Sequence, residues 1–327
     1  MTEKSGNRTG QKGVKVLVTG ADTELGYVTI RRLVSEGNNV SGICSSANGL
    51  AELNRSGATG YVLSKVSLDT LSALLAQAAP DVVLNLWPQP ANSLLHDGQR
   101  WRNYDRLLPA STRVLLEAIK NHSPGPPFLV QTSYTLLYGN TLQASEEQAV
   151  TAPGDDPIFR AALRAETMLS ISEVEACLLR LGYLYGPQSH DLKLYIKSFQ
   201  AFRPYYPGPP GQLQPWLHYE DAASALALAV SRQPAGEIFN VADDTPTSFG
   251  TFMDYFAEQA GFTRPWHIPR WSTPLTALIF TRQQFELLDQ TVTVNTGKIK
   301  NKLGWKLAYP SYLDGVREIM SAWNLAR

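Results

Sequence analysis

The chain has 327 residues and a formal net charge of zero, because 29 Lys and Arg side chains balance 29 Asp and Glu side chains. This balance gives no indication of a nucleic-acid partner or of binding to an anionic membrane surface. A chain of this length can bury a large core, either in one α/β unit or in a sheet domain with a smaller lobe.

The N-terminal residues 1–13 are polar and lack the apolar core of a signal peptide, so we expect a disordered tail there. No run approaches the roughly 18 consecutive apolar residues of a membrane span. The two cysteines, Cys44 and Cys177, each lie in an apolar run, which predicts buried, reduced thiols. We therefore expect a cytoplasmic protein without a membrane span.

Short apolar runs alternate with helix-length segments, a pattern typical of a parallel sheet covered by helices on both faces. The first half of the chain predicts strands at 14–19, 40–44, 60–64, 81–86, 128–131 and 176–181. Between them it predicts a glycine turn at 20–26 and helices at 26–34, 71–78, 104–120 and 158–172. The second half predicts an irregular Pro/Gly-rich loop at 202–215, a helix at 220–230, a strand at 237–241 and a mostly helical remainder at 248–327.

These elements predict a doubly wound, Rossmann-type α/β fold with a smaller, mostly helical C-terminal lobe. Residues 14–182 form the expected sheet domain, to which 216–242 return. Residues 183–215 and 243–327 form the expected smaller lobe, which would carry substrate or partner contacts.

Five motifs occur along this pattern in a fixed order. They are Val-Thr-Gly-Ala-Asp-Thr-Glu-Leu-Gly at 18–26, Thr-Ser-Tyr-Thr-Leu-Leu-Tyr-Gly at 132–139, Arg-Leu-Gly-Tyr-Leu-Tyr-Gly-Pro at 180–187, Trp-Leu-His-Tyr-Glu-Asp at 216–221 with Phe-Asn-Val at 239–241, and Lys-Leu-Gly-Trp at 302–305. In this order the chain resembles the extended short-chain dehydrogenase/reductase family, the NAD-dependent epimerase/dehydratase group, over nearly its whole length. The resemblance implies a dinucleotide-binding sheet and hydride chemistry that uses a Ser-Tyr-Lys triad.

The residues that carry this chemistry in the family are replaced in this chain. The family's Ser or Thr stands five residues before the glycine of the Tyr-Gly pair, and this position is Tyr134. An ungapped alignment of 157–166 puts Ile158 at the position of the tyrosine and Ala162 at that of the lysine. Neither side chain can move a proton or lower the pKa of a neighbour. We therefore predict an atypical member without the triad, in which Tyr134 is either a packing residue or a general acid.

The phosphate loop is also altered. The residues that could contact a dinucleotide are Gly20, Thr23, Leu25, Gly26 and Ser45. Thr23 replaces the middle glycine, whose missing Cβ normally lets the pyrophosphate approach the backbone. Asp22 and Glu24 add negative charge at this helix start, where they could serve as caps. Ser45 stands where NAD-preferring members carry an acid, so the sequence selects neither NAD nor NADP and leaves open whether either binds.

The remaining cleft is expected to be aromatic and weakly polar. Its candidate lining residues are Trp87, Gln89, Tyr138, Tyr185, His190, Trp216 and His218. Such a lining suits a small hydrophobic ligand, although the rings could instead fill the space of a lost cofactor and substrate. The family's diphosphate-clamping arginine is Gln214 here, which argues against a nucleotide sugar. No histidine or cysteine spacing predicts a metal site.

Three smaller expectations concern structural roles for polar residues. His218 could serve a structural role where the lobe docks, Arg180 is expected in an internal ion pair, and Asp221 is expected to cap the following helix.

Three functions are compatible with these replacements. The favoured hypothesis is a non-catalytic binding or scaffold protein, either a homodimer or a subunit of an assembly. A second is a lyase, isomerase or cyclase that acts on a small hydrophobic substrate. A third is an NAD(P)-dependent epimerase or reductase that uses other residues.

Overall fold

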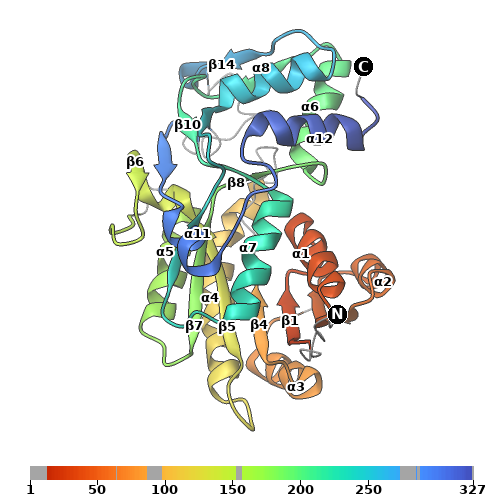
Figure 1. Ribbon diagram of the computed structural model, residues 1–327, viewed down its shortest axis with the longest axis vertical. Helices are drawn as coiled ribbons and strands as arrows, with labels where there is room; N and C mark the ends of the chain where they lie inside the picture. The colour runs from red at the N-terminus through yellow and green to blue at the C-terminus, as the bar shows by residue number, and fades with distance from the viewer. Residues whose placement is uncertain are drawn as a thin grey trace, which may run out of the picture.

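A computed structural model describes residues 13–63, 65–86, 98–151, 157–272, 285 and 288–325 of the chain. A sheet domain lies at the bottom of Figure 1 and a smaller lobe at the top. Among the described residues, no helix is both long and apolar enough to cross a membrane.

The central sheet has seven strands, all paired in parallel. Their order across the sheet is β12 (Ile238–Val241), β7 (Ala176–Leu181), β5 (Phe128–Tyr134), β4 (Val82–Asn85), β1 (Lys15–Thr19), β2 (Asn39–Cys44) and β3 (Thr59–Val62). The chain changes its direction of travel across the sheet between β1 and β4. This order confirms the predicted Rossmann-type fold, in which ligands bind beyond the strand ends at this switch point.

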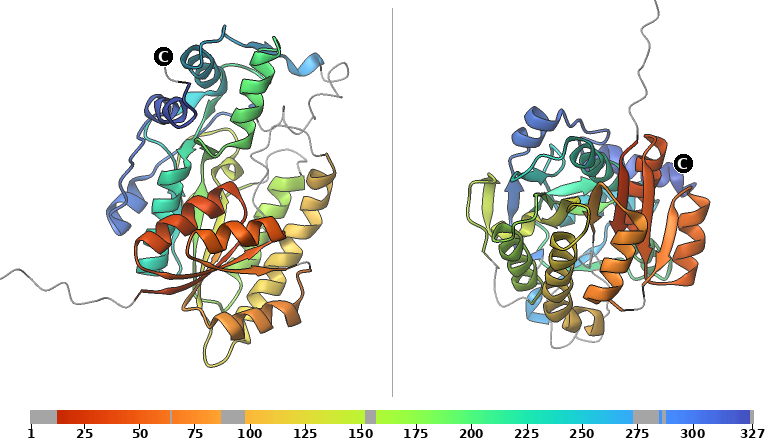
Figure 2. Two further views of the ribbon diagram at one scale, coloured as in Figure 1. Left: turned by 90° about the vertical axis from the view of Figure 1, so that its right-hand side faces the viewer. Right: turned by 90° about the horizontal axis from the view of Figure 1, so that it is seen from below.

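Helices cover both faces of the sheet, as Figure 2 shows. One face carries α1 (Glu24–Ser35), α2 (Ala47–Arg55) and α7 (Tyr219–Arg232), and the other carries α3 (Leu68–Ala78), α4 (Gly98–Lys120) and α5 (Pro157–Ser170). Successive residues of a strand serve opposite cores: Val16 and Val18 pack in the core with α1 and α7, whereas Leu17 packs in the core with α3 and α4. Burial on both sides explains why these strands are continuously apolar in sequence.

The lobe is built from α6 (His190–Gln200), α8 (Phe249–Gln259) and α12 (Tyr312–Ala322) around an aromatic core. Short strands pair in and beside it: β8 (Tyr183–Tyr185) with β11 (Trp216–His218), β9 (Tyr205–Pro207) with β14 (Trp266–Ile268), β10 (Leu213–Gln214) with β13 (Thr247–Ser248), and β6 (Thr141–Ala144) with β15 (Val292–Val294). The described part also contains the short helices η1 (Thr135–Tyr138), η2 (Arg270–Ser272) and α11 (Gly297–Leu303).

Three sequence expectations differ from the structure. The segment 202–215 is not wholly irregular, because β9 and β10 pair with β14 and β13 from distant parts of the chain. Helix α2 was not expected; Ser46 caps it by accepting a hydrogen bond from the Gly49 N–H. Helix α4 begins at Gly98, six residues before the predicted start.

Candidate dinucleotide-binding site

A tight glycine turn joins β1 to α1 at the switch point of the sheet. Gly20 has φ +65°, and a Cβ added to it would lie 3.1 Å from the Leu86 carbonyl oxygen after β4. Both facts favour glycine, since other L-residues rarely adopt this conformation. The turn therefore brings the backbone at the start of α1 close to the carboxyl ends of β1 and β4.

Thr23 caps α1 with its own side chain. Its Oγ1 accepts the Gly26 N–H at 3.1 Å and donates to the Gly20 carbonyl oxygen at 2.6 Å. The expectation that Asp22 or Glu24 could provide the cap is therefore wrong. The hydroxyl of Thr23 is folded onto the loop itself.

The first turn of α1 keeps backbone donors for an anion. The N–H groups of Glu24 and Leu25 precede the first residues that find an intrahelical acceptor. Aligned peptide dipoles add partial positive charge at the start of this 12-residue helix. The Leu25 side chain is only 2% exposed, so this residue could reach a ligand through its backbone alone.

Asp22 reaches from the same loop to the end of β2. Its Oδ2 accepts hydrogen bonds from the backbone N–H and from the hydroxyl of Ser45, both at 2.7 Å. The glycine turn, the free N–H groups and this carboxylate fit a dinucleotide, in which the first turn of α1 would hold the pyrophosphate. Contacts of the predicted residues Gly20, Thr23, Leu25, Gly26 and Ser45 with a cofactor stay predictions.

A buried row of polar side chains crosses the strand ends beneath this loop. Thr19 donates to Asn85 Oδ1, and Asn85 Nδ2 donates to Gln131 Oε1 at 2.8 Å. The three residues are register partners on β1, β4 and β5. None of the three was a predicted site residue, although each is a polar residue at or near the end of an apolar run. The row ties together the three strands that bear the switch point.

Tyr134 ends β5 and is partly buried. It packs against an apolar cluster that includes Ala162 on α5, a residue only 3% exposed. The side chain of Ile158 lies outside the described residues, and so do Trp87 and Gln89. The absence of the triad and the catalytic role of Tyr134 stay predictions.

Tyr138 belongs to a buried polar cluster rather than to an open surface. Its hydroxyl donates to Asn240 Oδ1 at 3.0 Å and accepts from Arg180 Nη1 at 2.7 Å. Burial raises its pKa, and Arg180 opposes this shift. Arg180 also pairs with Glu166, which confirms the expected internal ion pair, and Ser133 donates to the same carboxylate. Both hydrogen bonds of the Tyr138 hydroxyl are therefore made to buried side chains of the core.

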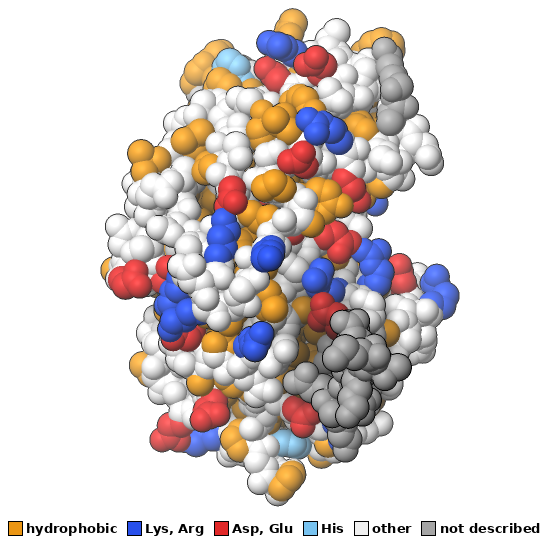
Figure 3. Space-filling view, viewed as in Figure 1, with side chains coloured by type: hydrophobic (Ala, Val, Ile, Leu, Met, Phe, Trp, Pro, Cys, Tyr) orange, Lys and Arg blue, Asp and Glu red, His pale blue; other side chains and the backbone are white. Residues whose placement is uncertain are grey.

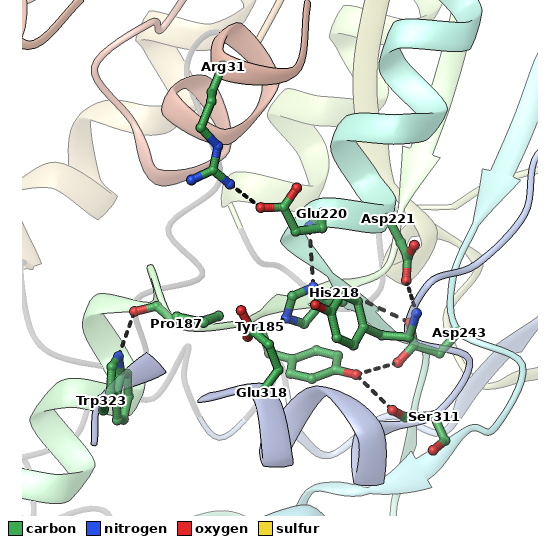
Figure 4. A network of polar contacts seen from close by, with 11 residues as sticks. Arg31, Tyr185, Pro187, His218, Glu220, Asp221, Asp243, Ser311, Glu318 and Trp323 are labelled. Atoms are coloured by element: carbon green, nitrogen blue, oxygen red, sulfur yellow. Dashed lines mark hydrogen bonds and ion pairs between the residues drawn. The ribbon is translucent and has the colours of Figure 1, made fainter. Parts of the chain in front are cut away.

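A second polar network joins the sheet domain to the lobe (Figure 4). His218 is fully buried and caps α7, because its Nδ1 accepts the Glu220 N–H at 3.3 Å. Asp221 was expected to be the cap, but its two oxygens accept the N–H groups of Ala308 and Tyr309 at 2.7 and 2.9 Å. Thus His218 has the structural role that the sequence left open, and Asp221 anchors the segment before α12.

Tyr185 and Asp243 are buried in this network. The Tyr185 hydroxyl lies 2.9 Å from Asp243 Oδ2, to which it donates, and burial raises the pKa of both groups. Burial alone is the largest influence on Asp243, whose pKa rises to about 8. Glu220, whose N–H donates to His218, forms an ion pair with Arg31 of α1, so the network extends to the helix that starts at the phosphate loop.

The remaining pocket candidates are dispersed. Trp216 is 1% exposed and stacks on Phe252 with ring centroids 3.9 Å apart, whereas His190 is exposed at the start of α6. Gln214 is buried and donates to the Gln290 carbonyl oxygen at 2.8 Å. Among the described residues, no group of His, Cys, Asp and Glu could hold a metal ion. A notch separates α12 from α1 and α2 on the right of Figure 3, at the side of the sheet where α1 begins.

Comparison with known proteins identifies the family. The profile of the NAD-dependent epimerase/dehydratase family matches residues 16–242, from β1 to the end of the central sheet. The chain belongs to this family.

The similarity to relatives and to solved structures extends over almost the whole length of this chain. A 3-diazoavenalumate denitrifying reductase from Streptomyces sp. is 26% identical over 315 residues, which are 93% of this chain and 99% of the relative. A dTDP-glucose 4,6-dehydratase from Bacillus anthracis, in complex with NAD, superposes with a TM-score of 0.77 at 16% identity over 95% of this chain and 97% of its own. A human epimerase family protein with NADPH gives 0.74 at 17% identity over 94% and 99%. The dehydratase thus holds NAD and the human protein holds NADPH.

Proposed function

We propose that this family member binds a nicotinamide dinucleotide at the start of α1 and reduces a small, strongly electrophilic molecule without a tyrosine–lysine pair. One combination of observations carries the proposal. At the start of α1 the chain has a glycine turn and N–H groups to which no described residue is bonded, while the motif alignment puts Ile158 and the buried Ala162 at the positions of the pair.

The geometry of the loop supports binding. The N–H groups of Glu24 and Leu25 would hold the pyrophosphate, and Gly20 allows the ligand to lie beside the ends of β1 and β4. Thr23 satisfies its own helix through the Gly26 N–H, so its hydroxyl does not need a partner from the ligand. When bound, a reduced nicotinamide supplies a hydride.

Without a tyrosine–lysine pair, only some electrophiles can accept the hydride. Reducing a ketone or aldehyde builds negative charge on oxygen, which a positioned acid must neutralise. Ile158 and Ala162 cannot do so, and Tyr134 has no lysine at position 162 to lower its pKa. A cationic acceptor takes a hydride without needing that proton, because the product is neutral. Hydride addition to the carbon of an iminium ion gives an amine, and replacement of dinitrogen in an arenediazonium ion by hydride gives the arene and N₂. The diazo group in the name of the Streptomyces reductase supports this class.

Consumption of NADH and NADPH, followed by absorbance, tests the proposal. We expect consumption with arenediazonium or iminium compounds, above the rate without protein, and none with a panel of aldehydes and ketones. Because these acceptors need no proton, Tyr134→Phe should leave turnover unchanged, as should Tyr61→Phe, at another partly buried tyrosine on β3. Consumption of ketones at ordinary reductase rates, or no consumption of any acceptor, would contradict the proposal.

A second candidate is a non-catalytic dinucleotide-binding protein. The observation in its favour is that Ala162 lies in an apolar cluster with Phe159, Ala161 and Ala165, where a proton-handling group is replaced by plain packing. This candidate predicts calorimetrically measurable binding of a dinucleotide and no turnover with either class of acceptor. Turnover above the protein-free rate would exclude it.

A further inference from the structure

We propose that Asp22 supplies the carboxylate that holds the adenosine ribose hydroxyls, and that it thereby selects NAD(H) over NADP(H). The inference rests on the proposed function, because it assumes that a dinucleotide binds at the start of α1. It assigns a specificity-determining role to a loop residue, whereas the position directly after β2 holds an uncharged serine, Ser45.

The Asp22 carboxylate lies at the end of β2, although Asp22 itself belongs to the loop that follows β1. Asp22 follows Gly20 by two residues, yet its Oδ2 lies 2.7 Å from both the N–H and the hydroxyl of Ser45. A Cβ added to Gly49 would lie 2.7 Å from Asp22 Cβ, so the start of α2 packs closely against the aspartate. The Asp22 side chain is thus fixed between β1, β2 and α2, where parallel α/β sheets bind the adenosine half of a dinucleotide.

The carboxylate keeps capacity for a ligand. Both hydrogen bonds from Ser45 go to Oδ2, and no described residue donates to Oδ1. An ionised carboxylate can accept about four hydrogen bonds, two on each oxygen. Since ribose hydroxyls are donors, Oδ1 can accept one or both of them.

The surroundings disfavour a second phosphate on the ribose. Burial, and then the carboxylates of Glu52 and Asp22, raise the pKa of Tyr27 to about 12, so two negative charges lie near this tyrosine. In the described part of the chain, no lysine or arginine forms an ion pair with Asp22. The cations of α1 are engaged elsewhere, Arg31 with Glu220 and Arg32 with Glu36. A 2′-phosphate would meet an uncompensated carboxylate.

Calorimetric titration with NAD⁺, NADP⁺, ADP-ribose and 2′-phospho-ADP-ribose tests the inference, because the last two lack nicotinamide and report on the adenosine half alone. We expect the unphosphorylated member of each pair to bind at least ten times more tightly. Asp22→Asn should reduce this ratio by about tenfold, through weaker binding of NAD⁺ and stronger binding of NADP⁺. Asp22→Ser, which is smaller, is a second variant if Asp22→Asn fails to fold.

Glu36→Gln is the matched control, since it makes the same change in net charge at the other end of α1 and should leave the ratio unchanged. Equal or tighter binding of the phosphorylated ligands to the parent, or an unaltered ratio in the Asp22 variants, would overturn the role of Asp22 and leave the proposed reduction intact. Absence of binding of all four ligands would overturn both. A normal NAD⁺ preference without any turnover would contradict only the reduction.

Discussion

Arg180 and Glu166 form a buried ion pair between β7 and α5, with Nη2–Oε2 and Nε–Oε1 distances of 2.7 and 3.1 Å. Both side chains are less than 10% exposed. Glu166→Gln would leave the guanidinium buried without a counter-charge, so we expect it to lower the free energy of unfolding by about 3–5 kcal/mol. Urea unfolding measures this change.

The exposed pair of Lys120 and Glu173 provides the control for that measurement. Glu173→Gln makes the same chemical change at the surface, where solvent screens the charges, and the urea midpoint should be unchanged. Equal effects of the two glutamine variants would show that the buried pair is not stabilising the fold as argued.

Asp243 should make stability depend on pH in the neutral range. Burial raises its pKa from 3.8 to about 8, so folding favours the protonated carboxyl. The folded protein then holds a proton that the unfolded chain releases. This contribution is fully present below pH 3.8 and is lost as the pH rises through about 8, and the free energy of unfolding falls across that window.

Thermal unfolding of Asp243→Asn between pH 5 and 8 tests this sign. The amide cannot ionise. Between pH 5 and 8 we therefore expect the free energy of unfolding of the variant to rise relative to that of the parent by about 1 kcal/mol or more. Asp244→Asn, at a half-exposed neighbour that pairs with Lys300, should show no such gain. Parallel pH profiles for the parent and Asp243→Asn would contradict the argument.

Trp216 should matter for stability through its stacking on Phe252 in the aromatic core of the lobe. Trp216→Ala would open a large cavity, and we expect a loss of about 3–5 kcal/mol. Trp266→Ala removes the same side chain from a site that is 80% exposed and should change stability by less than about 0.5 kcal/mol. A small effect at Trp216, measured by urea unfolding, would point back to a role in lining a pocket.

The sheet could be predicted from sequence because local patterns determine it. Strands buried on both faces are continuously apolar, and glycines mark their turns, as Gly20 and Gly26 do at β1. The short strands of the lobe depend on pairing partners far along the chain. Tyr205 pairs with Trp266, for example, and nothing in the local sequence of either segment reveals the other.

The candidate site was predictable in position but not in detail. The family motifs located the phosphate loop and Tyr134, and the Arg180 ion pair was expected. The directions of side chains could not be predicted. Asp22 turns toward Ser45, and His218 rather than Asp221 caps α7. Aromatic residues that follow strand ends looked like pocket walls, yet Trp216 lies inside the lobe. Residue type alone does not show which side of a strand end faces a cleft.

Thr23 should limit how closely a dinucleotide approaches the phosphate loop. Thr23→Gly removes the Cβ at the position of the family's middle glycine, so we expect several-fold tighter binding of NAD⁺ by calorimetry. Thr23→Ala keeps the Cβ but loses the cap to the Gly26 N–H, and it should cost about 1 kcal/mol of stability, against a few tenths for glycine. Comparing the two variants separates the crowding of the pyrophosphate by the Thr23 Cβ from the capping of α1 by the Thr23 hydroxyl. If alanine improves affinity as much as glycine does, the Thr23 hydroxyl rather than its Cβ opposes the ligand, and the proposed crowding of the pyrophosphate is wrong.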